Sequence, residues 1–220
     1  MKASQPKYLR LQSFILALLL LIPGANANLV LAAPKEVAKT IIFLGDSLTE
    51  GYNIPREAAY PAVVGDLFQK NGYKNIKIIN AGVSGSTSAS ALARLRWHLR
   101  SKERADILVL ALGANDGLRG LDTTSMRKNL EQTIHLAKKE KMKVVLAGMK
   151  VPPNYGKEYS DRFEKTFSDI ASAEGITLIP FLLEGVGGEP KYNLPDGIHP
   201  NVEGAKIIGN LVYNFLEPIL

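Results

Sequence analysis

Five short, continuously apolar runs, each followed by a longer segment with helical spacing, restrict the folds open to this chain more than any other feature. An apolar run without polar alternation is typical of a strand that is buried on both faces of a parallel sheet. Strands that alternate with helices predict one doubly wound, three-layer α/β/α domain, and 220 residues with 46% hydrophobic content suit a single core. We expect strands over residues 40–44, 76–80, 106–112, 143–148 and 177–180, and helices over 58–70, 88–100, 124–141, 160–174 and 202–216.

The order of these strands matters because doubly wound sheets bind their ligands where the strand order reverses. We expect a five-stranded parallel sheet in the flavodoxin-like order 2-1-3-4-5, within one domain over residues 38–220 that has no internal repeat or linker. In that order the first strand lies between the second and the third. The loops that follow these three strands then converge at one edge of the sheet.

The first 27 residues have the layout of a secretory signal peptide. Three basic residues precede an apolar run over 14–22, and Ala25-Asn26-Ala27 follows as an A-x-A cleavage site. We expect cleavage after Ala27. Cleavage after Ala33 and an uncleaved anchor are the alternatives, although residues 23–26 interrupt the stretch of about 20 apolar residues that a spanning helix needs. The sequence thus predicts an exported protein, periplasmic or secreted, without a stable membrane span after cleavage.

Charge and cysteine content exclude several classes of protein. The formal net charge is +6, and removal of residues 1–27 leaves 24 Lys and Arg against 21 Asp and Glu, a surplus too small to indicate a nucleic-acid partner. The chain has no Cys, which excludes disulfides, thiolate metal sites and a Cys nucleophile. His98 and His135 lie within expected helices without a second ligand at metal spacing, so we expect no metal site. The composition does not determine the oligomeric state, and we expect a monomer.

The sequence Gly45-Asp46-Ser47 ends the first apolar run abruptly. A Ser at the carboxyl end of such a strand can present its hydroxyl to a ligand at the edge of the sheet. Near the other end of the chain, Asp196 precedes His199 by three residues. At this spacing the carboxylate can bind Nδ1 of the imidazole and leave Nε2 free to accept a proton from a Ser hydroxyl. The alternatives are structural: a turn at Ser47, a helix N-cap at Asp196 and a polar loop residue at His199.

Two further residues follow expected strands at the same edge. Gly82 comes after the second strand and Asn115 after the third. A tetrahedral oxyanion needs two or three hydrogen-bond donors near one point, and the Ser47 amide, the Gly82 amide and the Asn115 side-chain NH₂ can supply them. Taken separately, Gly82 and Asn115 are also ordinary turn residues.

Together these blocks resemble those of the SGNH/GDSL hydrolase family, and the match extends over nearly all of residues 40–217. Residues 113–120, 153–159 and 196–201 are similar to one branch of it, the multifunctional periplasmic acyl-CoA thioesterase, lysophospholipase and arylesterase type. The blocks that carry the resemblance are Gly45-Asp46-Ser47-Leu48, Gly82, Gly113-x-Asn115-Asp116 and Asp196-x-x-His199.

The resemblance implies a serine esterase that hydrolyses small-molecule acyl esters or thioesters without a metal or organic cofactor. It implies Ser47 as nucleophile, His199 as base, Asp196 as the acid that orients it, and an oxyanion hole of Ser47, Gly82 and Asn115. One departure is Ala114, where the branch has Gly. Ala disfavours positive φ, which puts a close backbone approach at this position in question.

The long loops after the fourth and fifth expected strands are candidates for the substrate site, because ordered loops of this length usually serve function. Tyr155, Leu182, Leu183 and Val186 lie in them and either line an acyl groove or pack within the loops. Their apolar character favours acyl chains over a carbohydrate O-acetylesterase, which the same blocks also allow. An exported binding module with a defunct site is the non-enzymatic hypothesis, and the complete set of site residues speaks against it.

Overall fold

A computed structural model of the chain describes residues 37–100 and 104–220. The expected signal peptide and both expected cleavage sites lie outside these residues. Within them, no helix combines the length and the apolar character needed to cross a bilayer.

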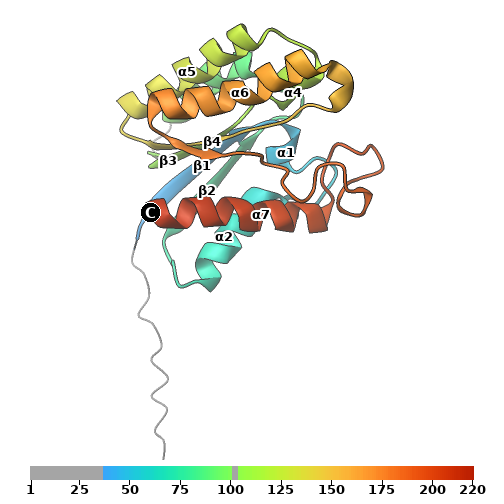
Figure 1. Ribbon diagram of the computed structural model, residues 1–220. Helices are drawn as coiled ribbons and strands as arrows, with labels where there is room; N and C mark the ends of the chain where they lie inside the picture. The colour runs from blue at the N-terminus through green and yellow to red at the C-terminus, as the bar shows by residue number, and fades with distance from the viewer. Residues whose placement is uncertain (1–36, 101–103) are drawn as a thin grey trace, which may run out of the picture. The chain divides into compact units, whose positions relative to one another are not determined.

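The described residues contain one parallel sheet of five strands, whose neighbours are ordered β2-β1-β3-β4-β5 (Figure 1). This confirms the predicted order, with β1 paired to β2 on one side and to β3 on the other. The five predicted strands all form, with ends that differ by up to two residues from those expected. Their bounds are β1 Lys39–Gly45, β2 Ile76–Gly82, β3 Ile107–Ala111, β4 Lys143–Ala147 and β5 Thr177–Ile179.

Helices cover both faces of the sheet, with α5 and α6 on one face and α2 and α7 on the other (Figure 1). The five longer helices are the predicted ones: α2 Tyr60–Lys70, α3 Ala91–Leu99, α5 Thr123–Lys139, α6 Lys157–Glu174 and α7 Val202–Leu216. Two short helices were not predicted, α1 Ser47–Glu50 and α4 Ala114–Leu118. Single 3₁₀ turns lie at η1 Arg56–Ala58, η2 Ser88–Ser90, η3 Pro153–Tyr155, η4 Pro190–Tyr192 and η5 Glu217–Ile219.

Side-chain caps explain where several helices begin. The Asp122 carboxylate accepts the Ser125 N–H at 2.8 Å before α5, and the Asn201 side-chain oxygen accepts the Gly204 N–H at 3.0 Å before α7. Each cap satisfies a backbone donor that the first turn of a helix leaves free. Helix α6 begins at Lys157 and not at residue 160, because Gly156 ends the η3 turn with φ +83° and lets the helix start directly after it.

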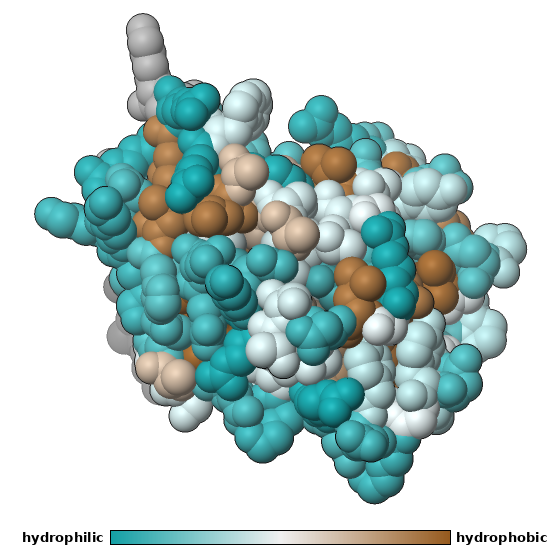
Figure 2. Space-filling model, turned by 90° about the horizontal axis from the view of Figure 1, so that it is seen from above, coloured by the Kyte–Doolittle hydropathy of each residue, from teal (hydrophilic) through white to brown (hydrophobic). Residues whose placement is uncertain are grey.

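The core lies between the sheet and its helices. Residues 41–44 of β1 and 107–111 of β3 are almost completely buried, as expected for strands covered on both faces. On α5 the buried apolar side chains recur every three or four residues and so lie on one face of the helix: Met126, Leu130, Ile134 and Ala137. Figure 2 views the molecule from the side of α5 and α6, where hydrophilic side chains predominate and hydrophobic ones form separate groups among them.

Candidate active site

The nucleophile candidate lies at the point where β1 ends and α1 begins. Ser47 is the first residue of α1, and Asp46 caps this helix by accepting the Leu48 N–H at 3.0 Å. Gly51 ends the helix with φ +87°. Because β1 is flanked by β2 and β3, Ser47 lies at the reversal point of the sheet, where doubly wound folds bind their ligands.

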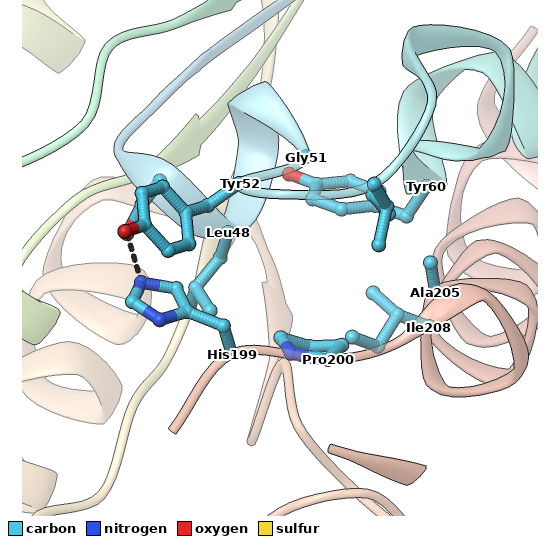
Figure 3. A pocket seen from close by; sticks show the side chains of 10 residues that line it. Leu48, Gly51, Tyr52, Tyr60, His199, Pro200, Ala205 and Ile208 are labelled. Atoms are coloured by element: carbon cyan, nitrogen blue, oxygen red, sulfur yellow. Dashed lines mark hydrogen bonds between the residues drawn. The ribbon is translucent and has the colours of Figure 1, made fainter. Parts of the chain in front are cut away.

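Ser47, His199 and Asp196 form one continuous hydrogen-bonded chain. The Ser47 Oγ lies 2.9 Å from His199 Nε2, and His199 Nδ1 lies 2.8 Å from Asp196 Oδ2. The dashed line that ends on the His199 ring in Figure 3 marks the bond to Ser47. The other Asp196 oxygen accepts the N–H groups of Ile198 and His199, both at 3.0 Å, in a tight turn that Gly197 permits with φ +75°. The predicted proximity of these three side chains is therefore present.

The hydrogen bonds around Asp196 favour its charged form. Partial burial acts against ionisation, but the bonds donated by the His199 ring and by the two backbone N–H groups outweigh it and lower the pKa of the Asp196 carboxyl. An ionised acceptor on Nδ1 holds the imidazole in the tautomer whose Nε2 can take a proton from Ser47.

Tyr52 is a site residue that the sequence did not reveal. Its ring lies beside the His199 ring, with centroids 4.4 Å apart and planes inclined by 35° (Figure 3). A cavity of only about 10 Å³ separates this pair from the apolar side chains of Ile54, Tyr60 and Ile208. The imidazole is thus confined by packing as well as by hydrogen bonds. No pattern links Tyr52 to His199, because they come from distant segments of the chain.

Asn115 lies at the start of α4 and lines the same cavity as Ser47. Its side-chain nitrogen donates to the Ser86 carbonyl at 3.1 Å and lies 3.4 Å from Asp46 Oδ2. The preceding left-handed position, with φ +126°, falls on Gly113, whereas Ala114 is helical. The departure from the family pattern at Ala114 therefore introduces no backbone strain here.

Gly82 is not placed as the sequence predicted, and we correct its assignment. Its N–H donates to the Asn80 side-chain oxygen at 2.9 Å, and Gly82 is absent from the lining of the cavity at Ser47. A Cβ at this position would lie 2.1 Å from the Glu50 backbone nitrogen. Position 82 therefore requires glycine because the end of β2 packs directly on the backbone of α1.

Gly85, three residues further along the chain in the loop after β2, has the properties that were expected of Gly82. It lines the cavity with Ser47 and Asn115, and among the described residues its N–H has no hydrogen-bond partner. Its φ of +74° also favours glycine. The sequence around these two glycines does not indicate that Gly82 packs against α1 and that Gly85 lines the cavity.

A cavity of about 610 Å³ opens beside Ser47 and His199. Of the four residues predicted to line it, only Leu183 does so. Leu182 and Val186 are 1% and 0% exposed and belong to the core, and Tyr155 lies outside the lining, where its hydroxyl donates to the Leu118 carbonyl at 2.7 Å. The apolar wall consists largely of residues that were not predicted: Leu118, Met149, Val151, Pro153, Phe181 and Ile198.

In the described ranges, 37–100 and 104–220, no three His, Asp or Glu side chains gather in a geometry suited to a metal ion. The Asp46 side chain, next to Ser47, is 1% exposed. Burial raises the pKa of its carboxyl to about 6, although the Leu48 N–H and the nearby charges of His199 and Arg94 act in the opposite direction.

Comparison with known proteins identifies the family of the chain. The model of the GDSL-like lipase/acylhydrolase family matches residues 43–207. The chain belongs to this family. The family match and the relatives below support its expected class, an esterase.

Relatives of this GDSL esterase cover most of its length. It is 37% identical to an arylesterase of Vibrio mimicus over 182 residues, which make up 83% of the chain and 90% of the relative. It is 34% identical to the thioesterase 1/protease 1/lysophospholipase L1 of Escherichia coli strain K12 over 183 residues, or 83% of the chain and 86% of the relative. The crystal structure of TesA matches it with a TM-score of 0.79 and 35% identity, covering 83% of the chain and 100% of that structure. The predicted fold is confirmed.

The buried Asp46 gives this esterase a testable dependence of stability on pH. Because its pKa when folded, about 6, exceeds the ordinary 3.8, the folded state holds the proton more tightly than the unfolded chain. The contribution of Asp46 to the free energy of unfolding must therefore fall as the pH rises from about 4 to about 6. At 1.36 kcal/mol per pKa unit the loss amounts to about 3 kcal/mol.

Asp46→Asn should abolish this contribution while its side-chain oxygen still caps α1. We expect the variant to gain up to about 3 kcal/mol relative to the parent between pH 4 and pH 7, measured by urea unfolding at several pH values. A difference between the two proteins that does not change with pH would contradict the buried-carboxylate explanation.

Proposed function

We propose that this esterase cleaves acyl esters or thioesters through an acyl-enzyme formed on Ser47. Ser47 Oγ attacks the carbonyl carbon while His199 Nε2 takes its proton, and His199 then donates that proton to the leaving oxygen or sulfur. Water then attacks the acyl carbonyl carbon while His199 Nε2 takes a proton from it. His199 returns this proton to Ser47 Oγ as the carboxylic acid leaves. The observation that carries the proposal is the hydrogen-bonded chain from Ser47 through His199 to Asp196, with distances of 2.9 and 2.8 Å.

Three donors can stabilise the oxyanion in this mechanism. The Ser47 N–H lies at the N-terminal end of α1, the Gly85 N–H is without a partner among the described residues, and the Asn115 NH₂ is oriented by the Ser86 carbonyl. We assign the second donor to Gly85 in place of Gly82, whose N–H is occupied by Asn80. Preorganised donors of this kind stabilise the charge that develops only in the tetrahedral transition state.

The substrate class follows from the cavity. A volume of about 610 Å³ with a mainly apolar wall suits an acyl chain of several carbons better than an acetyl group. The names of the relatives, arylesterase and thioesterase 1/lysophospholipase L1, support the same class. We include export in the proposal, with residues 1–27 as a signal peptide and a periplasmic or secreted mature protein.

Replacement of the proposed nucleophile, Ser47, or of the proposed base, His199, tests the mechanism. Ser47→Ala and His199→Ala should each lower kcat on a nitrophenyl ester by on the order of 10⁴-fold or more, because nucleophile and base act as a unit. A fluorophosphonate should label the parent protein stoichiometrically at Ser47 and fail to label Ser47→Ala. Substantial turnover by a folded Ser47→Ala protein would refute the proposal, and absence of any turnover by the parent would support a binding module.

The Asn115 donor should act in the transition state and not in substrate binding. Asn115→Ala should lower kcat by about 10²–10³-fold and leave KM within a few-fold, the usual result of losing one oxyanion donor. Asn210→Ala, which removes an exposed amide on α7, is the matched control. If Asn115 served only the turn, the variant would melt at a lower temperature while the kcat of its folded fraction stayed normal.

Chain-length dependence separates acyl esters from acetylated sugars as substrates. Each methylene that enters the apolar cavity contributes about 0.8 kcal/mol, so kcat/KM should rise up to about fourfold per carbon until the cavity is filled. Nitrophenyl esters of graded length measure this rise. A maximum at acetate, together with faster release of acetate from acetylated sugars, would favour the carbohydrate O-acetylesterase instead.

Two neighbouring leucines provide matched variants for that experiment. Leu183→Ala changes the cavity wall and should flatten the chain-length profile. Leu182→Ala deletes a core side chain that is 1% exposed, and should lower the free energy of unfolding by about 2–5 kcal/mol without changing the profile.

A further inference from the structure

The direction of the Gly85 N–H depends on the turn that contains it. The Ser86 N–H donates to the Val83 carbonyl at 3.2 Å, and Gly85 has φ +74° whereas Ser84 has no positive φ. These features identify a type II turn over residues 83–86. Types I and II differ by a flip of the central peptide, which here joins Ser84 to Gly85. A flip would therefore turn the Gly85 N–H away from its present direction.

Side chains hold the peptides on both sides of this central one. The Glu50 carboxylate accepts the Ser84 N–H at 2.8 Å and, through the same oxygen, the Ser84 hydroxyl. On the other side, Arg119 donates to the Gly85 carbonyl at 3.0 Å. Asn115 holds the peptide after that by donating to the Ser86 carbonyl at 3.1 Å. Together these bonds fix the position of turn 83–86, and with it the position of the Gly85 N–H, relative to α1 and to the segment 115–119.

Glu50 differs from Arg119 and Asn115 because it lies on α1, the helix that carries Ser47. It is the last residue of α1, and Ser47 is the first. The backbone of this helix also receives the Asn80 side chain, whose nitrogen donates to the Thr49 carbonyl at 2.8 Å. Nucleophile, Glu50 and turn 83–86 are thus connected within one small unit.

We propose that Glu50 is a positioning residue that aims the Gly85 N–H at the oxyanion by clamping Ser84. The inference rests on the proposed function, since it assumes attack by Ser47 and donation by Gly85. Glu50 acts through its two hydrogen bonds and not through its charge, because its side chain is exposed and its field is screened by solvent. A neutral acceptor of the same shape can then replace it.

The test compares Glu50→Ala with Glu50→Gln. Glu50→Ala should lower kcat by roughly tenfold to a hundredfold, less than complete loss of one oxyanion donor, with KM within a few-fold. Glu50→Gln keeps an oxygen that accepts both Ser84 bonds, and should stay within about threefold of the parent. An alkyl boronic acid, which becomes tetrahedral on adding Ser47 Oγ, should bind Glu50→Ala more weakly by about the same factor as the fall in kcat.

Two further variants provide a control for the loss of an exposed carboxylate and a second test of the Ser84 bonds. Glu57→Ala removes another exposed carboxylate, on η1, and should leave kcat unchanged. Ser84→Ala deletes the hydroxyl bond but keeps the N–H bond, so its kcat should fall by less than that of Glu50→Ala, and it replaces that variant if Glu50→Ala does not fold. Unchanged kcat in folded Glu50→Ala, or an equal loss in Glu50→Gln, would overturn the clamp. Failure of the proposed function is distinguishable, because it would appear as turnover by Ser47→Ala.

Discussion

The backbone of α1 packs directly on the end of β2, and the placement of Ser47 relative to turn 83–86 depends on this contact. Only glycine fits at position 82, where a Cβ would lie 2.1 Å from the Glu50 nitrogen. The contact sets the separation between the nucleophile at the start of α1 and turn 83–86, which continues from β2. A side chain at position 82 would push these two parts of the site away from each other.

Around that contact, hydrogen bonds join segments that are far apart in sequence. His199 reaches Ser47 across 152 positions, and Asn115 binds Ser86 across 29. The sheet makes this possible, because parallel strands bring the loops at their carboxyl ends to one edge. Once the strands are in place, the side chains on these loops lie within hydrogen-bonding distance of one another. Holding groups in a fixed mutual orientation is what a reaction between them requires.

One carboxylate of the site lowers the stability of the fold near neutral pH. Asp46, next to Ser47 in the chain, is buried, and this burial raises the pKa of its carboxyl to about 6 and makes its ionised form unfavourable for folding. The same carboxylate caps α1 and lies 3.4 Å from the Asn115 side chain, which it helps to orient. The extensive apolar core of strands and helices compensates for such locally unfavourable groups.

Sequence alone was sufficient to predict the strands, their order and the proximity of Ser47, His199 and Asp196. Continuous apolar runs identify buried strands, and Asp196 and His199 lie within a single turn, so their contact depends on local geometry that spacing reveals. The distinction between Gly82 and Gly85, and between Leu182 and Leu183, required the folded structure. Adjacent or nearby residues of the same type carry identical local signals, and only packing against α1, the core and the cavity decides which of them faces the substrate. Tyr52 likewise meets His199 only after the chain has folded, because no periodicity connects residues from such distant segments.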